Sequence, residues 1–225
     1  MSRSILVLGA TGVSGLAFIE EALQRPNPPK LTLYVRNPSK LPSGTESKAR
    51  IVKGQLNDEA ALATALEGVD TVVSVLGGYP TFSDFLSRNK STPLADDLKV
   101  VIKVMKAKGV RRILALSTPS YAVPGETYTW KQSAYLTMPP LMTPQGNAEM
   151  VAIAETVAAE SDLDWTIFRV PHLTEASADL PVYAGLIGPG YKGSLELSRA
   201  SQARWILKEI EDRAWIKQAP ALGNF

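Results

Sequence analysis

Three glycines near the beginning of the chain, Gly9, Gly12 and Gly15, have the spacing of a turn that holds phosphate. They follow four apolar residues, 5–8, which are typical of a strand buried on both faces, and they lead into a helical pattern. In such a unit the first glycine permits the tight turn, the second leaves room for a diphosphate, and the third lets the helix pack closely. The helix N-terminus adds unpaired N–H groups. The spacing therefore predicts a dinucleotide-binding turn.

Arg36 stands directly after the second predicted strand, 31–35. An acidic residue at this position accepts hydrogen bonds from the ribose 2′-hydroxyl of a dinucleotide, whereas an arginine neutralises a 2′-phosphate. The last strand residues supply no acid, and Ser39 and Lys40 add a hydroxyl and a second positive charge. The sequence therefore predicts NADP (NADPH) rather than NAD as the cofactor.

Candidates for chemistry at the reacting end of a bound cofactor are Ser117, Tyr135 and His172. Ser117 ends a predicted strand, where its hydroxyl could hold a substrate carbonyl. Tyr135, like Tyr128, lies in an aromatic stretch that could close over the site. His172 is the only histidine and belongs to the one residue type that titrates near neutral pH. The sequence leaves open which of these, if any, donates a proton.

Composition excludes several classes of function. The 225 residues carry a net charge of +2, which argues against a dedicated nucleic-acid surface. There is no cysteine, so disulfides, thiolate catalysis and cysteine-based metal sites are excluded. Neither a signal peptide nor an apolar run of about 18 residues is evident. We expect a cytoplasmic protein with a small-molecule substrate, no metal, and no nucleic-acid or membrane partner; the oligomeric state stays open.

The elements that must position these residues alternate along the chain. Apolar runs predict strands at 5–8, 31–35, 50–53, 71–76, 112–117 and 165–169, and helical spacing predicts helices from 15, at 59–66, at 93–108 and at 148–159. In the first helix Leu16, Ile19 and Leu23 form the stripe expected to face the sheet. Such alternation implies a parallel sheet with helices on both faces. We expect a single α/β domain over 1–225, a doubly wound Rossmann-type sheet.

Three stretches interrupt this alternation, at 78–92, 119–144 and 172–193. They are rich in aromatic residues, glycine or proline and show no clean period, so we expect irregular loops. Each follows a predicted strand, and in an open α/β sheet the loops after the strands line the crevice where ligands bind. We therefore expect these loops, with the C-terminal segment, to form the substrate side of the site.

Six segments, 9–15, 35–40, 54–58, 66–74, 76–78 and 164–169, together resemble the NAD(P)H-binding atypical short-chain dehydrogenase/reductases. Within that group the chain is most similar to NmrA-like proteins and to biliverdin and flavin reductases. The resemblance implies a pyrophosphate site, contacts flanking the adenine, a cover over the nicotinamide ribose, residues beside the nicotinamide ring, and a loop passing its carboxamide. Gly9, Thr11, Gly12, Val13 and Gly15 would form the pyrophosphate site, and Leu56 and Asn57 would flank the adenine. Leu76 and Gly77 would cover the nicotinamide ribose, and Ser117 and Thr118 would lie beside the ring. Pro171 would belong to the loop that passes the carboxamide.

The chain departs from the wider superfamily at the proton donor. Its typical tyrosine, followed four residues later by lysine, is absent, because Tyr121, Tyr128 and Tyr135 are followed at that spacing by glycine, glutamine and proline. The resemblance still implies an NADPH-dependent oxidoreductase that transfers hydride to a small conjugated or aromatic carbonyl or flavin-like substrate, with water as an alternative proton source. The alternatives are a non-catalytic NAD(P)-sensing regulator of NmrA type, or a non-redox isomerase or cyclase.

Overall fold

The computed structural model describes residues 3–77 and 90–225. The strands are β1 (Ser4–Leu8), β2 (Lys30–Val35), β3 (Arg50–Lys53), β4 (Thr71–Ser74), β5 (Arg112–Ser117), β6 (Asp164–Arg169), β7 (His172–Thr174), β8 (Val182–Gly185), β9 (Glu196–Ser198) and β10 (Ala221–Asn224). The α-helices are α1 (Val13–Leu23), α2 (Glu59–Ala65), α4 (Pro93–Ala107), α5 (Trp130–Met142), α6 (Pro144–Ala158) and α7 (Arg199–Asp212); η1 (Pro38–Lys40) and η2 (Thr45–Ser47) are 3₁₀ turns.

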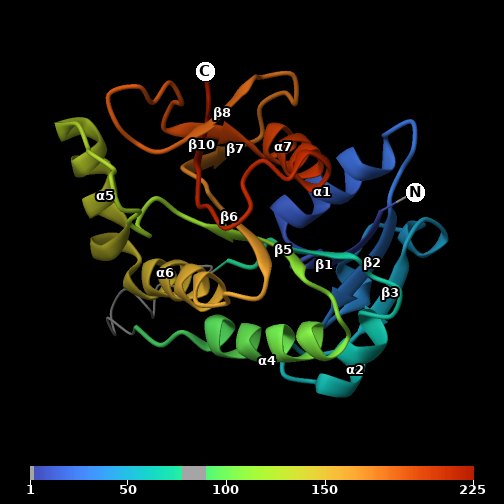
Figure 1. Ribbon diagram of the computed structural model, residues 1–225. Coiled ribbons are helices and arrows are strands. Elements are labelled where there is room, and N and C mark those ends of the chain that lie inside the picture. Colours follow the sequence, from blue (N-terminus) through green and yellow to red (C-terminus); the bar gives the residue numbers. More distant parts are fainter. Residues whose placement is uncertain (1–2, 78–89) are drawn as a thin grey trace.

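Eight strands form one sheet in the order β3-β2-β1-β4-β5-β6-β10-β8. All neighbours are parallel except β8, which runs antiparallel to β10, and β7 and β9 form a separate parallel pair. Helices α1 and α7 pack together on one face, and α2, α4 and α6 cover the other (Figure 1). This arrangement confirms the Rossmann-type α/β fold predicted from the alternation of elements.

The central strands form because their side chains are apolar on both faces. Ile5, Leu6, Val7 and Leu8 of β1 are each at most 1% exposed, as expected for a strand that has helices above and below it. Polar residues mark where helices begin and end: the Asp58 side chain accepts the Ala61 N–H at the start of α2. The carboxyl ends of the strands meet at one edge of the sheet because β1 to β6 pair in parallel, and the site is built at that edge.

The buried face of α1 differs from the predicted stripe. Gly15, Phe18, Ile19 and Ala22 are buried, whereas Leu16 and Leu23 are only partly covered. The reason is the close approach of the helix to the first turn: a Cβ on Gly15 would lie 2.3 Å from the carbonyl oxygen of Gly9. Because α1 approaches the sheet most closely at Gly15, the side of the helix that carries Gly15 faces the sheet. Leu16 and Leu23 then lie at the edge of the buried side.

Two of the stretches expected to be irregular contain regular structure. Residues 130–142 form α5, which begins with a capping box between Thr129 and Gln132. The prediction of a loop was wrong because Pro139 and Pro140 argued against a helix, yet both lie inside it. The stretch 172–193 contains β7 and β8, which are short and lack a clear alternation. Residues 78–89 of the first stretch lie outside the described residues.

The C-terminal segment completes the sheet and was not assigned elements from the sequence. Helix α7 begins at Ser198, whose side chain accepts the Ser201 N–H, and β10 then adds beside β6. A buried ion pair holds the end of α7: Arg112 Nη2 lies 2.9 Å from Glu209 Oε1, and both side chains are at most 3% exposed. Burial lowers the pKa of Arg112 to about 10, against the opposing pull of Glu209.

Candidate functional site

The glycine-rich turn leaves open space at the N-terminus of α1. Gly9 has a φ of +80°, which favours glycine, and its amide geometry is fixed by the Gly12 N–H, which donates to its carbonyl at 3.0 Å. Gly12 itself has φ −80°, a value that any residue adopts, and no side chain caps the helix. The backbone conformation at position 12 therefore does not require glycine. The choice of glycine there is instead consistent with a need for space beside the backbone, where a side chain would otherwise lie. The first N–H groups of α1 point to that space.

A cavity of about 140 Å³ lies beside this turn at the carboxyl ends of β1, β2, β3 and β4. This edge is where open α/β sheets bind dinucleotides. Its walls come from the first turn, the end of β2, the loop after β3, the segment after β4 and the first turns of α4. They are Gly9, Ala10, Thr11, Tyr34, Val35, Arg36, Gly54, Gln55, Leu56, Leu76, Leu94 and Asp97.

Arg36 stands exposed at the rim of this cavity. Its guanidinium makes no hydrogen bond or ion pair with any residue in 3–77 or 90–225, so its donors are free for a ligand. The neighbouring hydroxyl is engaged differently: Ser39 Oγ donates to Asn37 Oδ1 at 2.8 Å, inside η1. Lys40 is exposed at the end of the same turn. The structure thus places Arg36 after β2 on the same cavity as the glycine-rich turn.

Tyr34 shapes the cavity and was not picked out from the sequence. Its phenol donates to the backbone carbonyl of Gln55 at 2.7 Å, and a Cβ on Gly54 would lie 2.2 Å from the phenol oxygen. Burial, with a smaller contribution from Asp58, raises the pKa of Tyr34 to about 12. The neutral phenol thereby holds the loop that carries Leu56 and Asn57; Leu56 lines the cavity, and Asn57 is exposed beside it.

At the end of β5 the two predicted hydroxyls have different environments. Ser117 is fully buried, and its Oγ donates to the carbonyl of Met150 in α6 at 2.8 Å, so its hydroxyl hydrogen is committed within the protein. Thr118 Oγ1 is buried with no hydrogen-bond partner among the described residues. Gly77 lies close by: a Cβ there would be 3.7 Å from Leu116 Cδ2. Thr118 is thus the hydroxyl left available to a ligand.

A second, smaller cavity lies beyond β5 and β6, between α5 and the segment before β9. It is lined mainly by apolar side chains, namely Pro119, Gln132, Tyr135, Leu136, Pro171, Ile187, Tyr191, Ser194, Leu195 and Leu222. Burial raises the pKa of Tyr135, partly offset by a backbone hydrogen bond with His172, so the phenol is protonated at neutral pH. The side chain of His172 is exposed at the start of β7 and is not part of this lining.

A comparison with protein families shows which family the chain belongs to. The family described as NAD(P)H-binding matches residues 9–213 of the chain. The chain belongs to the NAD(P)H-binding family. The match begins at Gly9, the first residue of the predicted turn, and includes every lining residue of the two cavities except Leu222. The family match confirms the NAD(P)H-binding part of the sequence resemblance.

Several solved structures share the fold of this chain. A short-chain dehydrogenase/reductase from Veillonella parvula in complex with NADP has a TM-score of 0.76 at 18% identity, covering 100% of this chain and 95% of its own. A Rossmann-fold NAD(P)-binding family protein from Shigella flexneri has a TM-score of 0.70 at 23% identity, covering 100% and 94%. ChuY, an anaerobillin reductase from Escherichia coli O157:H7, has a TM-score of 0.72 at 18% identity, covering 99% and 97%.

A buried ion pair fixes the walls of the apolar cavity in this NAD(P)H-binding protein. Arg169, at the end of β6, is fully buried and pairs through both Nη atoms with Glu126, which is 1% exposed. The same carboxylate accepts the Ile187 N–H at 2.8 Å and the Tyr128 hydroxyl at 2.7 Å. Tyr128, considered from the sequence as a proton donor, is thus held in this network, and burial and Glu126 raise its pKa to about 12.

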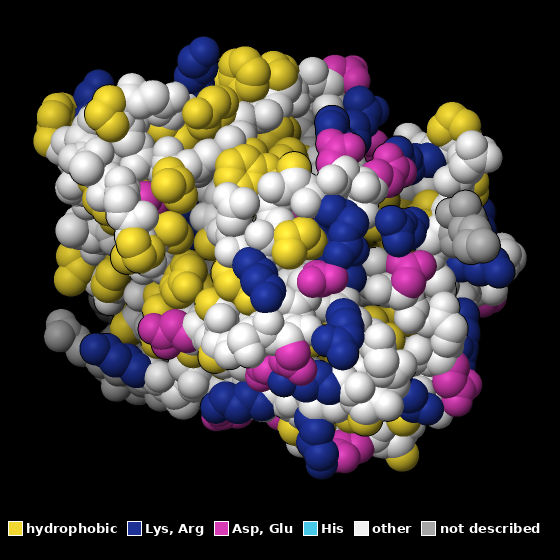
Figure 2. Space-filling view, in the orientation of Figure 1, with side chains coloured by type: hydrophobic (Ala, Val, Ile, Leu, Met, Phe, Trp, Pro, Cys, Tyr) yellow, Lys and Arg dark blue, Asp and Glu magenta, His cyan; other side chains and the backbone are white. Residues whose placement is uncertain are grey.

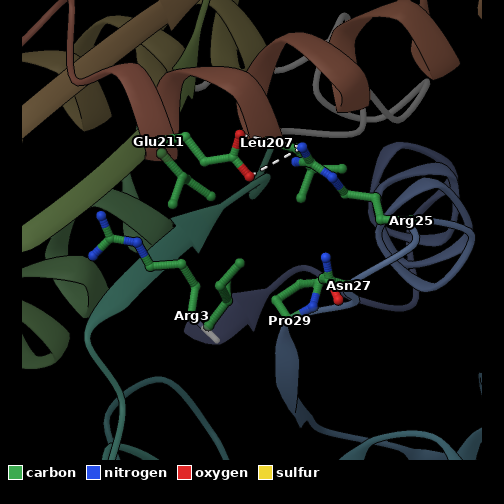
Figure 3. Close-up of a pocket in the computed structure, with 8 residues that line it drawn as sticks. Arg3, Arg25, Asn27, Pro29, Leu207 and Glu211 are labelled. Atoms are coloured by element: carbon green, nitrogen blue, oxygen red, sulfur yellow. Dashed lines mark hydrogen bonds and ion pairs between the residues drawn. The ribbon is translucent and has the colours of Figure 1, made fainter. Parts of the chain in front are cut away.

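The cavity in Figure 3, of about 420 Å³, lies at the opposite edge of the sheet. Arg3 precedes β1 and Pro29 precedes β2, so this cavity opens at the amino ends of the strands. Arg25 crosses it and pairs with Glu211 of α7 at 3.0 Å. Dinucleotides bind at the carboxyl ends of parallel strands, so the larger cavity is not the cofactor site. No helix in the described part of the chain is long and apolar enough to cross a membrane.

Proposed function

We propose that the protein is an NADPH-dependent reductase. The observation that carries the proposal is Arg36, whose guanidinium has no partner among the described residues and lies at the rim of a cavity that begins at Gly9. An unpaired arginine directly after β2 matches a 2′-phosphate, which NADPH has and NADH lacks. The backbone N–H groups at Thr11 and Val13 would hold the diphosphate at the N-terminus of α1, whereas the Gly12 N–H already donates to the Gly9 carbonyl at 3.0 Å.

The acceptor would lie in the apolar cavity between α5 and the ends of β5 and β6. NADPH, when bound, supplies hydride. Pro171 and Pro119 line this cavity, and Thr118, whose Oγ1 has no partner among the described residues, directly precedes Pro119 in the chain. The apolar walls suit a planar conjugated molecule such as a quinone, an enone or a flavin, but the cavity of about 10 Å³ would have to widen to admit one. Tyr135 shapes the wall, and water serves as proton source, since no tyrosine–lysine pair lowers a phenol pKa here.

The exposed surface of α5 supports a second candidate, a cofactor-sensing protein that binds a partner. This helix has no buried residue, and Trp130, Met138, Leu141 and Met142 are each more than half exposed. Apolar side chains gather on this side of the molecule, while charged ones are spread over the face formed by α4 (Figure 2). Apolar surface of this kind marks interaction sites in soluble proteins. A sensor would bind NADPH without oxidising it.

Calorimetry with NADPH and NADH tests the cofactor assignment. Arg36→Ala should weaken NADPH binding by about 10- to 100-fold, as expected for the loss of charge-assisted hydrogen bonds, and leave NADH binding unchanged. Arg3→Ala, at the opposite edge of the sheet, is the matched control and should change neither. Equal NADPH affinities for wild type and Arg36→Ala would remove the role of Arg36.

Oxidation of NADPH is then followed at 340 nm, the absorbance of the reduced cofactor, against quinones, enones and flavins. The reductase predicts turnover with at least one of them. Binding of NADPH without oxidation by any acceptor would instead favour the sensor, or a non-redox isomerase or cyclase. Absence of heat with both cofactors, on folded protein, would end all three.

A further inference from the structure

Asp97 is the only acidic side chain among the described residues that line the cavity beside the glycine-rich turn. It lies in the second turn of α4 and is partly buried. Its carboxylate makes no hydrogen bond or ion pair with any residue in 3–77 or 90–225. Arg36 lines the same cavity, and the two side chains do not pair with each other. One cavity wall therefore carries an acid and a base that are both left to a ligand.

The sequence of α4 explains why this carboxylate is free. The neighbouring Asp96 is exposed and pairs with Lys99, three residues further on, at 2.8 Å. The corresponding positions after Asp97 carry Val100 and Val101, which offer no side-chain donor. Two adjacent aspartates on one helix thus have different environments: one belongs to the surface, and the other lines the cavity without a partner.

The walls of the cavity indicate which part of a dinucleotide lies beside Asp97. In the proposed cofactor site the diphosphate lies at the turn that begins at Gly9 and the 2′-phosphate lies at Arg36, so the base occupies the space beyond the ribose. Leu56 and Leu94 line that cavity and suit the apolar faces of a planar ring. The volume of about 140 Å³ is about five times the 30 Å³ that a water takes up in the liquid, which is the size of a bicyclic base.

A carboxylate and the edge of an adenine ring are complementary. The 6-amino group is the donor on that edge, whereas the ring nitrogens accept, and an ionised carboxylate can only accept. Gln55 also lines the cavity, and its backbone carbonyl accepts the Tyr34 phenol. The amide of its side chain can donate as well as accept, so it does not distinguish an amino group from a carbonyl oxygen. Asp97 does make that distinction.

We propose that Asp97 recognises the adenine ring of the cofactor, with its carboxylate accepting a hydrogen bond from the 6-amino group. Asp97 is thereby a specificity-determining residue, because a purine with a carbonyl oxygen at position 6 would turn that oxygen towards a negative charge. Arg36 and Asp97 then recognise two parts of one adenosine, the phosphate and the base. The proposal rests on the cofactor site of the proposed function, but not on hydride transfer, and adenine is common to NADPH and NADH.

Calorimetry with a matched pair of dinucleotides tests this assignment. The pair is NADPH and reduced nicotinamide hypoxanthine dinucleotide phosphate, in which a carbonyl oxygen replaces the 6-amino group. Wild type should bind NADPH about 10-fold or more tightly than the hypoxanthine analogue. Asp97→Asn should bring the two affinities within about threefold, because its amide can accept from one base and donate to the other. NADH and its hypoxanthine analogue provide the same comparison without the 2′-phosphate.

Asp96→Asn is the matched control, since it makes the same chemical change one residue earlier, at a carboxylate that pairs with Lys99. It should keep the preference for adenine, and the thermal melts of both variants should equal that of wild type. Equal binding of the two dinucleotides by wild type, or a preference retained in Asp97→Asn, would overturn the inference. An equal loss of affinity for both dinucleotides in Asp97→Asn would also overturn it, because the carboxylate would then serve a ribose hydroxyl.

These outcomes are distinct from failure of the proposed function. If wild type prefers adenine, Asp97→Asn loses the preference and no acceptor oxidises NADPH, the reductase proposal falls and the role of Asp97 stands. If wild type oxidises NADPH but binds the hypoxanthine analogue equally well, only the role of Asp97 falls. Absence of heat with all four dinucleotides, on folded protein, would overturn both.

Discussion

Replacement of Glu126 by glutamine removes the charge that balances a fully buried arginine. The carboxylate accepts hydrogen bonds from both Nη atoms of Arg169, from the Ile187 N–H and from the Tyr128 hydroxyl. Breaking a buried ion pair on one side costs about 3–5 kcal/mol, since the remaining charge stays desolvated. For a chain of this size that cost corresponds to a melting temperature lower by about 6–20 °C. We expect Glu126→Gln to fold with such a loss.

The matched control is Glu175→Gln, because the exposed Glu175 pairs with Arg199 at 2.6 Å with its side chain 75% exposed. A surface pair of this kind contributes about 0–1 kcal/mol. Urea unfolding of both variants and wild type, followed by circular dichroism, measures the difference. A free energy of unfolding for Glu126→Gln within about 1 kcal/mol of wild type would refute the reasoning, because it would show that Arg169 is not left uncompensated.

The same pair predicts a dependence on pH. Burial pushes the pKa of Glu126 upward, but the hydrogen bonds from Arg169, Ile187 and Tyr128 outweigh it and hold the pKa below its ordinary value of 4.5. A lowered pKa in the folded state contributes stability that is present above 4.5 and is lost as the pH falls through the folded value. The stability gap between wild type and Glu126→Gln should therefore be full at pH 7 and shrink in acid. A gap that stays constant below pH 4 would contradict this.

Three further predictions concern the site and its supports. Gly15→Ala should destabilise the fold and weaken NADPH binding at least about tenfold by calorimetry, because its Cβ would meet the Gly9 carbonyl oxygen at 2.3 Å; Gly190→Ala, with open space around it, should do neither. Burial raises the pKa of Glu149, although hydrogen bonds from the N–H groups at the start of α4 oppose this shift. The protonated side chain therefore contributes stability below its ordinary pKa of 4.5, and that stability is lost as the pH rises through the folded value. Glu149→Gln should remove this pH-dependent loss in urea unfolding at about pH 4–8. Tyr135→Phe should keep turnover within about threefold, whereas a loss of about 100-fold would make its phenol the proton donor.

The predicted strands and the cofactor turn follow from local sequence. Apolar runs such as 112–117 form buried strands because a central strand of a parallel sheet is covered by helices on both faces. Gly9 and Gly15 are required by a positive φ and by a close helix–strand approach, and both requirements are visible in their spacing. Arg36 was singled out because its position after β2 depends only on where that strand ends.

Helix α5 and the buried pairs required the tertiary structure. Two prolines lie inside α5, where proline is normally disfavoured because it lacks the N–H that a helix interior uses. The capping box between Thr129 and Gln132 is the local signal that could have predicted the start of this helix. Arg169 and Glu126 are 43 residues apart, and nothing in local pattern pairs them. Long-range partners are set by packing, which a single sequence does not display.

The sequence by itself determined the alternation of strands and helices from β1 to β6 apart from α5, the glycine-rich turn and the cation after β2, because each depends on neighbouring residues along the chain. Tertiary structure alone decided which hydroxyl is free at the end of β5. Ser117 and Thr118 are adjacent and chemically alike, yet the first donates to Met150 and the second has no partner among the described residues. The difference arises because α6, 33 residues further on, packs against one side of the strand end and supplies a carbonyl only there.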